Sequence, residues 1–218
     1  MSLSAEQNIR DTLREMRHDK WGFLIYRCTY ADDPAWARFK QIINERSRQD
    51  VADSDVPELA NSLEWTFVED STTLDRASKE LTRARFRTWT ASGAEEAEQP
   101  RAIGHWAPMK SPRYEYFVRA DEGALRSFVN EAPQPPDFDL EGVGYVNLVD
   151  ASWRPHDDDS EDLDRNDQPF EPIEGCRAGN VGWMKTASQM VGLSGYDAFT
   201  TLGDWCAFSK RPPEVVTY

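Results

Sequence analysis

The chain has 218 residues, 39% of them hydrophobic and 29% charged, so it can bury a sizeable core without disulfides or a structural metal. It carries 39 acidic and 25 basic residues, a net charge of −14. Fourteen of the acids lie within residues 131–180, against three bases. So acidic a surface repels phosphate backbones, which excludes nucleic acid as an expected partner.

The first half of the chain predicts helices and strands in alternation. Residues 4–18 predict a helix, because Ser4 and Gln7 have the spacing of a capping box. The run WGFLIYRCTY at 21–30 is the most strand-like segment of the chain, and Asp33 and Pro34 then open a second helix as N-cap and N1 residues. A polar linker near 47–61, an alternating strand over 63–69 and a helix over 72–90 follow.

The second half begins with a long loop over 91–113. A strand over 114–120, a short helix capped by Asp121, a break at PQPP (133–136) and a strand over 143–149 come next. Residues 154–180 are acidic and aperiodic, which predicts irregular structure. The pattern then favours a helix over 183–193, another turn of helix over 196–202 and a closing strand over 204–208, and RPP at 211–213 ends regular structure.

This order predicts a single α+β domain over residues 1–218. The runs FLIYRCTY…DDPAWARF and YEYFVRAD…EGALRSF both give a strand, an arginine, an acidic cap and a helix. Two βαβ units in tandem favour a ferredoxin-like split βαβ sheet, with an inserted helix and an extra C-terminal helix. In that arrangement the first and third strands are neighbours at the centre of the sheet.

Two arginines hold matching places in these repeats, Arg27 and Arg119. If helices cover one face of the sheet, alternation along the strands sends both guanidinium groups to the other face, where they could bind a carboxylate or phosphate bidentately. The alternative is structural: Arg27 pairs with Glu115 or another acid while its stem packs on Phe117. The structural interpretation is favoured, because buried charges need partners in any fold.

The segment GHWAPMKSPRY at 104–114 lies in the longest loop between predicted elements. Long loops in compact domains often carry function, and His105 has the chemistry of a general acid or base near neutral pH. The alternative is a surface loop that Trp106 anchors. The alternative is favoured, since no nucleophile or orienting acid is tied to His105 by the sequence.

The remaining motifs mainly argue against particular kinds of site, namely metal sites, cofactor sites, disulfides and membrane spans. The run DDDSEDLDRND lacks the glycine and glutamate of a calcium-binding loop, and no metal site is expected. No P-loop, dinucleotide fingerprint, G-x-S-x-G or H-E-x-x-H motif occurs, and no cofactor is expected. Three widely spaced cysteines favour no disulfide framework, and no apolar run is long enough for a membrane span. We therefore expect a cytoplasmic protein that does not bind membranes.

The segments WGFLIYRCTYADDPAWARF and RYEYFVRAD, with the late tryptophan-rich region, resemble a set of acidic proteins from filamentous fungi. Those proteins share a W-G-F-x-I-Y-R-x-T-Y start, followed by an aspartate-capped helix with tryptophan. The resemblance implies a fungal source. It implies no activity and assigns no functional residue.

Together these features predict a non-catalytic binding protein that uses the second sheet face and the 104–114 loop. Its partner would be a protein, including a second copy that forms a homodimer through the sheet face, or a small anionic or aromatic ligand. The alternative is a small-molecule enzyme of the α+β barrel type, in which His105 or an arginine polarises the substrate. An enzyme needs a closed pocket that these side chains enter, whereas a binding module exposes an apolar patch.

Overall fold

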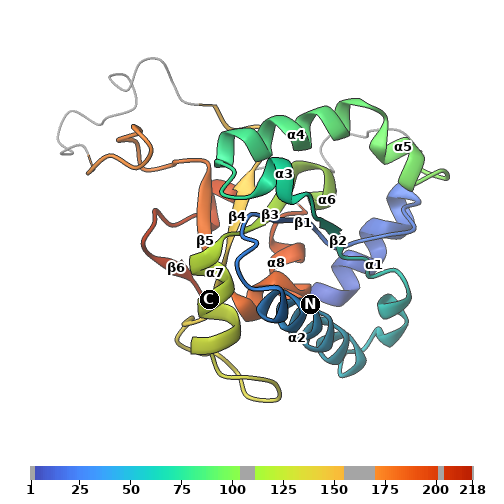
Figure 1. Ribbon diagram of the computed structural model, residues 1–218. Helices are drawn as coiled ribbons and strands as arrows, with labels where there is room; N and C mark the ends of the chain where they lie inside the picture. Colours follow the sequence, from blue (N-terminus) through green and yellow to red (C-terminus); the bar gives the residue numbers. More distant parts are fainter. Residues whose placement is uncertain (1–2, 104–110, 155–169, 201–203, 218) are drawn as a thin grey trace.

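The computed structural model describes residues 3–103, 111–154, 170–200 and 204–217 (Figure 1). A six-stranded mixed sheet with the order β2-β1-β3-β4-β5-β6 runs through this part of the chain. The strands are β1 (Leu24–Arg27), β2 (Thr66–Val68), β3 (Tyr116–Ala120), β4 (Tyr145–Asp150), β5 (Trp183–Ala187) and β6 (Val215–Val216). The predicted α+β class is confirmed.

Helices occupy much of the rest of the described chain. They are α1 (Ala5–Met16), α2 (Asp33–Ala52), α3 (Ser71–Leu74), α4 (Lys79–Ala91), α5 (Ala94–Glu98), α6 (Pro112–Glu115), α7 (Glu122–Arg126), α8 (Leu193–Ala198) and α9 (Asp204–Phe208), with short turns η1 (Pro57–Asn61), η2 (Ser127–Glu131) and η3 (Ser188–Val191). None of the described helices is long and apolar enough to cross a membrane.

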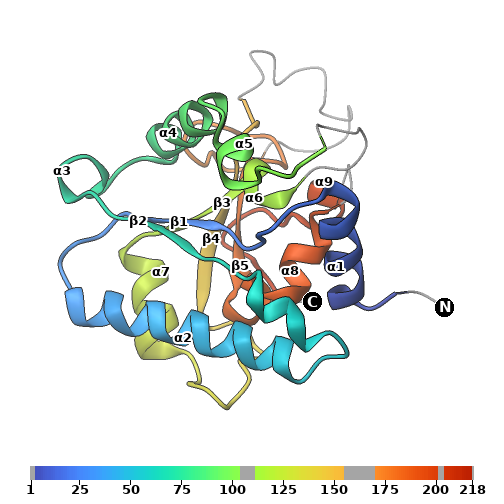
Figure 2. The same ribbon diagram turned by 90° about the vertical axis from the view of Figure 1, so that its right-hand side faces the viewer.

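Helices cover both faces of the sheet. On one face Ile25 and Val118 join a core with α1, α2, α7 and α8, and on the other Tyr26 and Phe117 join a core with Leu74 and Phe86 of α3 and α4. Figure 2 shows α3 and α4 on one side of the strands and α2 and α7 on the other. Helices of the same chain therefore cover the second sheet face. This face is not exposed for the homodimer that was predicted to form through it.

The ferredoxin-like arrangement is not confirmed. Strands β1 and β3 are neighbours, as the tandem repeats predicted, and they pair in parallel. They do not form the centre of the sheet, because β1 is second from one edge of the six strands. In a ferredoxin-like sheet, however, the second strand lies antiparallel beside the third, whereas here β2 lies parallel beside β1 and β4 lies beside β3. The helix α2 between β1 and β2 makes an ordinary βαβ crossover between adjacent strands, and two further strands extend the sheet beyond β4.

The capping residues set the helix starts close to their predicted places. Ser4 precedes α1, and its N–H donates to the side chain of Gln7 at 3.3 Å. Asp32, rather than Asp33, is the N-cap of α2, so Asp33 falls in the first turn and its carboxylate is released for another contact. α2 then continues to Ala52, through the first part of the segment expected to be a linker, because Ser47 and Val51 are buried along it.

The single helix predicted over 72–90 is two helices with a turn between them. Asp70 caps α3 and Ser78 caps α4, each by accepting a backbone N–H. Arg76 between them has a φ of 53°, in the left-handed region, and its N–H donates to the carbonyl of Cys28 at 3.1 Å. The turn is therefore fixed to the end of β1, a contact that the local sequence does not reveal.

Two C-terminal predictions were wrong in type, whereas the turn of helix predicted over 196–202 overlaps α8 (Leu193–Ala198). Residues 183–187 form a strand rather than a helix, because five residues of β4 pair with them in antiparallel register. Residues 204–208 form a helix rather than a strand, and β6 adds a parallel edge strand after the prolines that were expected to end regular structure. Most of the acidic segment predicted over 154–180 lies outside the described residues.

Candidate functional site

The two arginines singled out from the sequence lie on opposite faces of the sheet. In the parallel register of β1 and β3, Arg27 pairs with Ala120 and Arg119 pairs with Tyr26. Directly paired residues point to the same face, so Arg27 points toward α2 and Arg119 toward α3 and α4. A site that uses both guanidinium groups on one surface is therefore ruled out.

Arg27 is held in a structural ion-pair cluster. Its Nη2 lies 2.5 Å from Asp33 Oδ1, its Nη1 lies 3.6 Å from a Glu69 oxygen, and its Nε donates to the carbonyl of Thr29 at 2.8 Å. The guanidinium group also lies over the rings of Tyr30 and Trp36. The acids are not the predicted Glu115, but the cluster agrees with the structural interpretation of Arg27.

Arg119 is also buried and paired. Its Nε and Nη2 donate to the carbonyl of Ala77 at 3.1 and 2.7 Å, and its Nη1 lies 2.5 Å from Asp121 Oδ2. Asp121 caps α7 through its other oxygen and also accepts a bond from the side chain of Asn147 at 3.0 Å. Arg119 differs from Arg27 in one respect: it lines a cavity.

His105 and Trp106, the other predicted site residues, lie outside the described residues.

The cavity has a volume of about 370 Å³ and lies at the carboxyl ends of β1 and β3. Three segments form it: the β1–α2 connection, the turn between α3 and α4, and the β3–α7 connection. Its lining residues are Cys28, Thr29, Tyr30, Ala31, Asp75, Arg76, Arg119, Asp121 and Glu122. We name it the carboxyl-end cavity.

The topology explains why a cavity forms there. The β1–α2 and β3–α7 connections leave neighbouring strand ends for the face that α2 and α7 cover, and the turn between α3 and α4 closes the cavity from the other face. In open sheets with parallel strands, ligands bind outside the carboxyl ends of the strands. The two sequence repeats, each a strand followed by an aspartate-capped helix, thus meet at one place.

Several polar groups in this cavity have no partner within the described residues. The charged side chains of Asp75, Arg76 and Glu122 form no ion pair or hydrogen bond there, and the Thr29 hydroxyl forms none either. Arg76 is also in left-handed backbone geometry, which is costly for any residue with a Cβ. Unfavourable backbone conformations of this kind gather at ligand sites, where binding requires the side chain.

Cys28 places a thiol in the wall of the same cavity, but the thiol is not activated. Burial raises its pKa to about 11, against the opposing effect of the Arg119 charge nearby. At pH 7 only about one thiol in ten thousand is then ionised, and the thiolate is the nucleophilic form. The described lining residues include no histidine that could act as its base.

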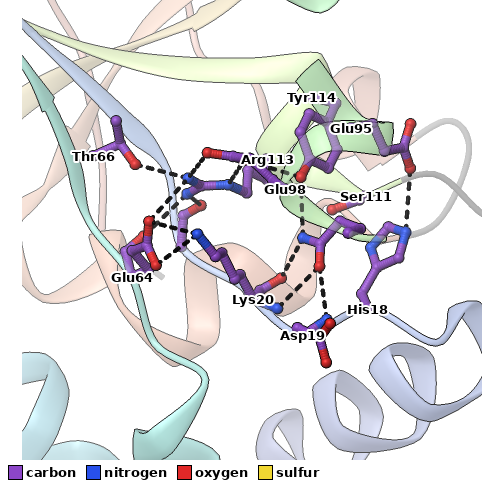
Figure 3. A network of polar contacts seen from close by, with 12 residues as sticks. His18, Asp19, Lys20, Glu64, Thr66, Glu95, Glu98, Ser111, Arg113 and Tyr114 are labelled. Carbon is purple, nitrogen blue, oxygen red and sulfur yellow. Dashed lines mark hydrogen bonds and ion pairs between the residues drawn. The ribbon is translucent and has the colours of Figure 1, made fainter. Parts of the chain in front are cut away.

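A second polar cluster lies at the opposite end of the parallel strands and centres on Arg113, which is fully buried (Figure 3). Its Nε and Nη2 donate to the two carboxylate oxygens of Glu98 at 2.7 and 2.9 Å. Its Nη1 donates to the carbonyls of Gly22 and Glu64, both at 3.0 Å, and its Nη2 also donates to the Thr66 hydroxyl at 2.7 Å.

This cluster has no capacity left for a ligand at its centre. A guanidinium group has five N–H donors, and the five bonds of Arg113 use all of them. Glu98 also accepts from the Tyr114 hydroxyl at 3.0 Å. Arg113 therefore acts structurally, because it ties α5 and α6 to the starts of β1 and β2.

The comparisons with known proteins add no homologue. No family model matches the chain, and neither the curated proteins nor the solved structures contain a match. The resemblance to acidic fungal proteins therefore stays a prediction. In the described part of the chain, no three histidine, cysteine or acidic residues gather in a way that could hold a metal ion.

Sequence reasoning found one lining residue of the cavity, Arg119, and missed Arg76. Arg76 falls inside the single helix predicted over 72–90, where an arginine is unremarkable. The available signal was the pair of caps Asp70 and Ser78, eight residues apart, which mark two helix starts instead of one. The repeat noted around Arg27 and Arg119 pointed to the right strand ends but not to the residues between them.

Proposed function

We propose that this protein binds a small zwitterionic molecule of the amino-acid type, without transforming it, in the carboxyl-end cavity. The observation that carries the proposal is that the unpaired charges in this cavity have both signs. Arg76 and the Thr29 hydroxyl are suited to a carboxylate, and Asp75 and Glu122 are suited to an ammonium group. A volume of about 370 Å³ suits a ligand of that size.

Binding is favoured over covalent catalysis by the state of Cys28. Its thiol is a potential nucleophile in the cavity wall, but its raised pKa keeps it protonated at neutral pH. The buried Arg119 is already neutralised by Asp121, so it forms part of the wall and does not supply an open charge.

The test is a thermal-shift screen of the twenty amino acids at millimolar concentration. A ligand present at about ten times its dissociation constant stabilises the folded state by about 1.4 kcal/mol, which raises the melting temperature of a chain of this length by about 3 to 6 °C. For the best amino acid, the amide that lacks the carboxylate and the acid that lacks the ammonium group should each lose most of the shift.

The variant Arg76→Gly removes the unpaired cation while its backbone stays in a region that glycine tolerates. It should abolish the ligand-induced shift, and Arg126→Gln on α7, an exposed arginine outside the cavity, should leave it unchanged. If no amino acid shifts the melting temperature, or if Arg76→Gly responds like the parent protein, the proposal fails.

A further inference from the structure

A second and larger cavity, of about 700 Å³, lies at the opposite, amino end of the parallel strands, between α1 and η1. Four arginines line it: Arg10, Arg14, Arg17 and Arg101. The one acid among its lining residues is Glu58. This excess of cations occurs in a chain that carries 39 acids against 25 bases, so composition alone does not account for it.

The floor of this cavity is apolar. Leu13 of α1, Val56 just before η1 and Leu59 of η1 line it, and each is almost fully buried from solvent. Apolar side chains below a rim of charge are suited to a ligand that has an apolar body as well as a charged group. The carboxyl-end cavity differs, because unpaired groups of both signs line it instead of a charged rim over an apolar floor.

Two of the four arginines are already used within the protein. Arg10 Nε lies 2.7 Å from Asp11, and Arg101 pairs with Asp19. Arg14 has only a distant contact, 3.9 Å from the same Asp11 oxygen, and Arg17 makes no ion pair or side-chain hydrogen bond within the described residues. Arg14 and Arg17 are therefore the cations that remain for an anion.

The backbone of Arg17 strengthens this conclusion. It follows the last turn of α1 with a φ of 54°, and its N–H donates to the carbonyl of Arg14 while that of His18 donates to Leu13. This is the helix-ending position that glycine usually occupies, because a Cβ is unfavourable there. An arginine at that position brings a free cation to the cavity rim at a conformational cost.

His18 adds a polar atom to the same wall. Its side chain is 2% exposed, and its Nε2 lies 3.2 Å from Glu95. Its other ring nitrogen, Nδ1, is buried and has no hydrogen-bond partner in the described part of the chain. Buried polar atoms are normally satisfied, so this nitrogen behind the cavity wall is an exception.

We propose that this cavity binds an amphiphilic anion, that is, a carboxylate, sulfonate or phosphate head group carried on an apolar aliphatic or aromatic body. Arg14 and Arg17 hold the head group, and the floor of Leu13, Val56 and Leu59 holds the body. The site goes beyond the proposed function, because it shares no lining residue with the carboxyl-end cavity.

The test uses 8-anilinonaphthalene-1-sulfonate as a fluorescent probe, with dodecanoate, dodecyl phosphate and dodecanol as competitors. We expect saturable probe binding, displaced by the two anions and at least tenfold less well by the uncharged alcohol. Acetate and inorganic phosphate, which have no apolar body, should not displace the probe. Equal competition by dodecanol and dodecanoate would overturn the role of the arginines, and displacement by acetate would overturn the role of the floor.

The variant pair Arg14→Gln with Arg17→Gly should weaken probe binding at least tenfold with an unchanged or higher melting temperature. Arg38→Gln with Arg126→Gln, which removes two positive charges from positions outside this cavity, is the matched control and should bind the probe like the parent protein. Unchanged affinity in the Arg14 and Arg17 variant, or equal loss in the control, would refute the site. Neither result bears on the amino-acid screen, which Arg76 tests.

Discussion

At the scale of single residues, a shift of one position in strand register overturned the hypothesis that Arg27 and Arg119 form one site. Aligning the two sequence repeats by their arginines places Arg27 opposite Arg119. The observed pairing places Arg27 opposite Ala120. Because side chains alternate between the faces of a sheet, a shift of one residue sends the two arginines to opposite faces. Each then finds acids on its own side, Asp33 for Arg27 and Asp121 for Arg119.

Two other arginines, Arg17 and Arg76, share an unusual property. Each has a positive φ, near 54° and 53°, each lines a cavity, and neither has a side-chain partner in the described residues. The structural arginines Arg27, Arg113 and Arg119 lie in strands or in a helix, and each pairs with an acid. Backbone strain combined with a free cation therefore distinguishes the arginines that we assign to binding.

Replacing either arginine by glycine should stabilise the unliganded protein. Glycine has no Cβ to crowd the left-handed conformation, so Arg17→Gly and Arg76→Gly should each raise the free energy of unfolding by about 1 kcal/mol. Urea denaturation measures this. The same change at Arg126, whose φ is −62°, should instead lower it by about 1 kcal/mol. Destabilisation by either of the first two variants would mean that the arginine side chain supports the fold.

At the scale of elements, the Arg113 cluster joins α5 and α6 to the starts of β1 and β2. Burial by itself would raise the pKa of the Glu98 carboxyl, but its hydrogen bonds and ion pair with Arg113 outweigh burial and lower that pKa. Burial also opposes the charge of Arg113, and Glu98 more than offsets it, so the pKa of Arg113 is raised. The two charges thus hold each other in place across α5 and α6.

This coupling predicts a pH-dependent loss in Glu98→Gln. A carboxyl whose pKa is lowered by folding stabilises the protein above its unfolded pKa of about 4.3, and this contribution disappears as the pH falls through the folded value. At pH 7 the variant should therefore be at least about 2 kcal/mol less stable than the parent protein, because Arg113 stays buried without its counter-ion. Below about pH 4 the two stabilities should converge.

Denaturation by urea across this pH range provides the measurement. The matched control is Glu131→Gln, whose partner Arg126 is exposed, and it should change stability by less than about 1 kcal/mol at any pH. A difference between Glu98→Gln and the parent protein that stays constant down to pH 3 would show that the carboxylate charge is not what Arg113 requires.

At the scale of the whole molecule, the sheet separates two cavities of different character. The carboxyl-end cavity has unpaired charges of both signs, and the cavity beside α1 has an arginine rim over an apolar floor. The two have no residue in common, and the first lies at the carboxyl ends of the parallel strands while the second lies at their amino ends. The buried strands and the Arg113 cluster lie between them.

Ligands of the two cavities should consequently bind independently. Coupling between sites requires that each ligand favour a different state of a shared element, and no lining residue is shared. Titration calorimetry with 8-anilinonaphthalene-1-sulfonate, in the presence and absence of the best amino acid, should give dissociation constants that agree within about twofold. A difference of about fivefold or more, the lower end of typical allosteric coupling, would contradict independence.

The sequence alone determined the α+β class, the starts of α1 and α7, the start of α2 to within one residue, and the neighbouring positions of β1 and β3 in the sheet. These features depend on local chemistry: caps that accept backbone N–H groups, alternating apolar residues, and a repeated strand-to-helix unit. Tertiary structure decided the face to which each arginine points, the strand conformation of residues 183–187, and the meeting of Arg76 with the end of β1. These depend on register and on partners distant in the chain, where one residue of shift or one neighbouring strand reverses the outcome that local pattern favours.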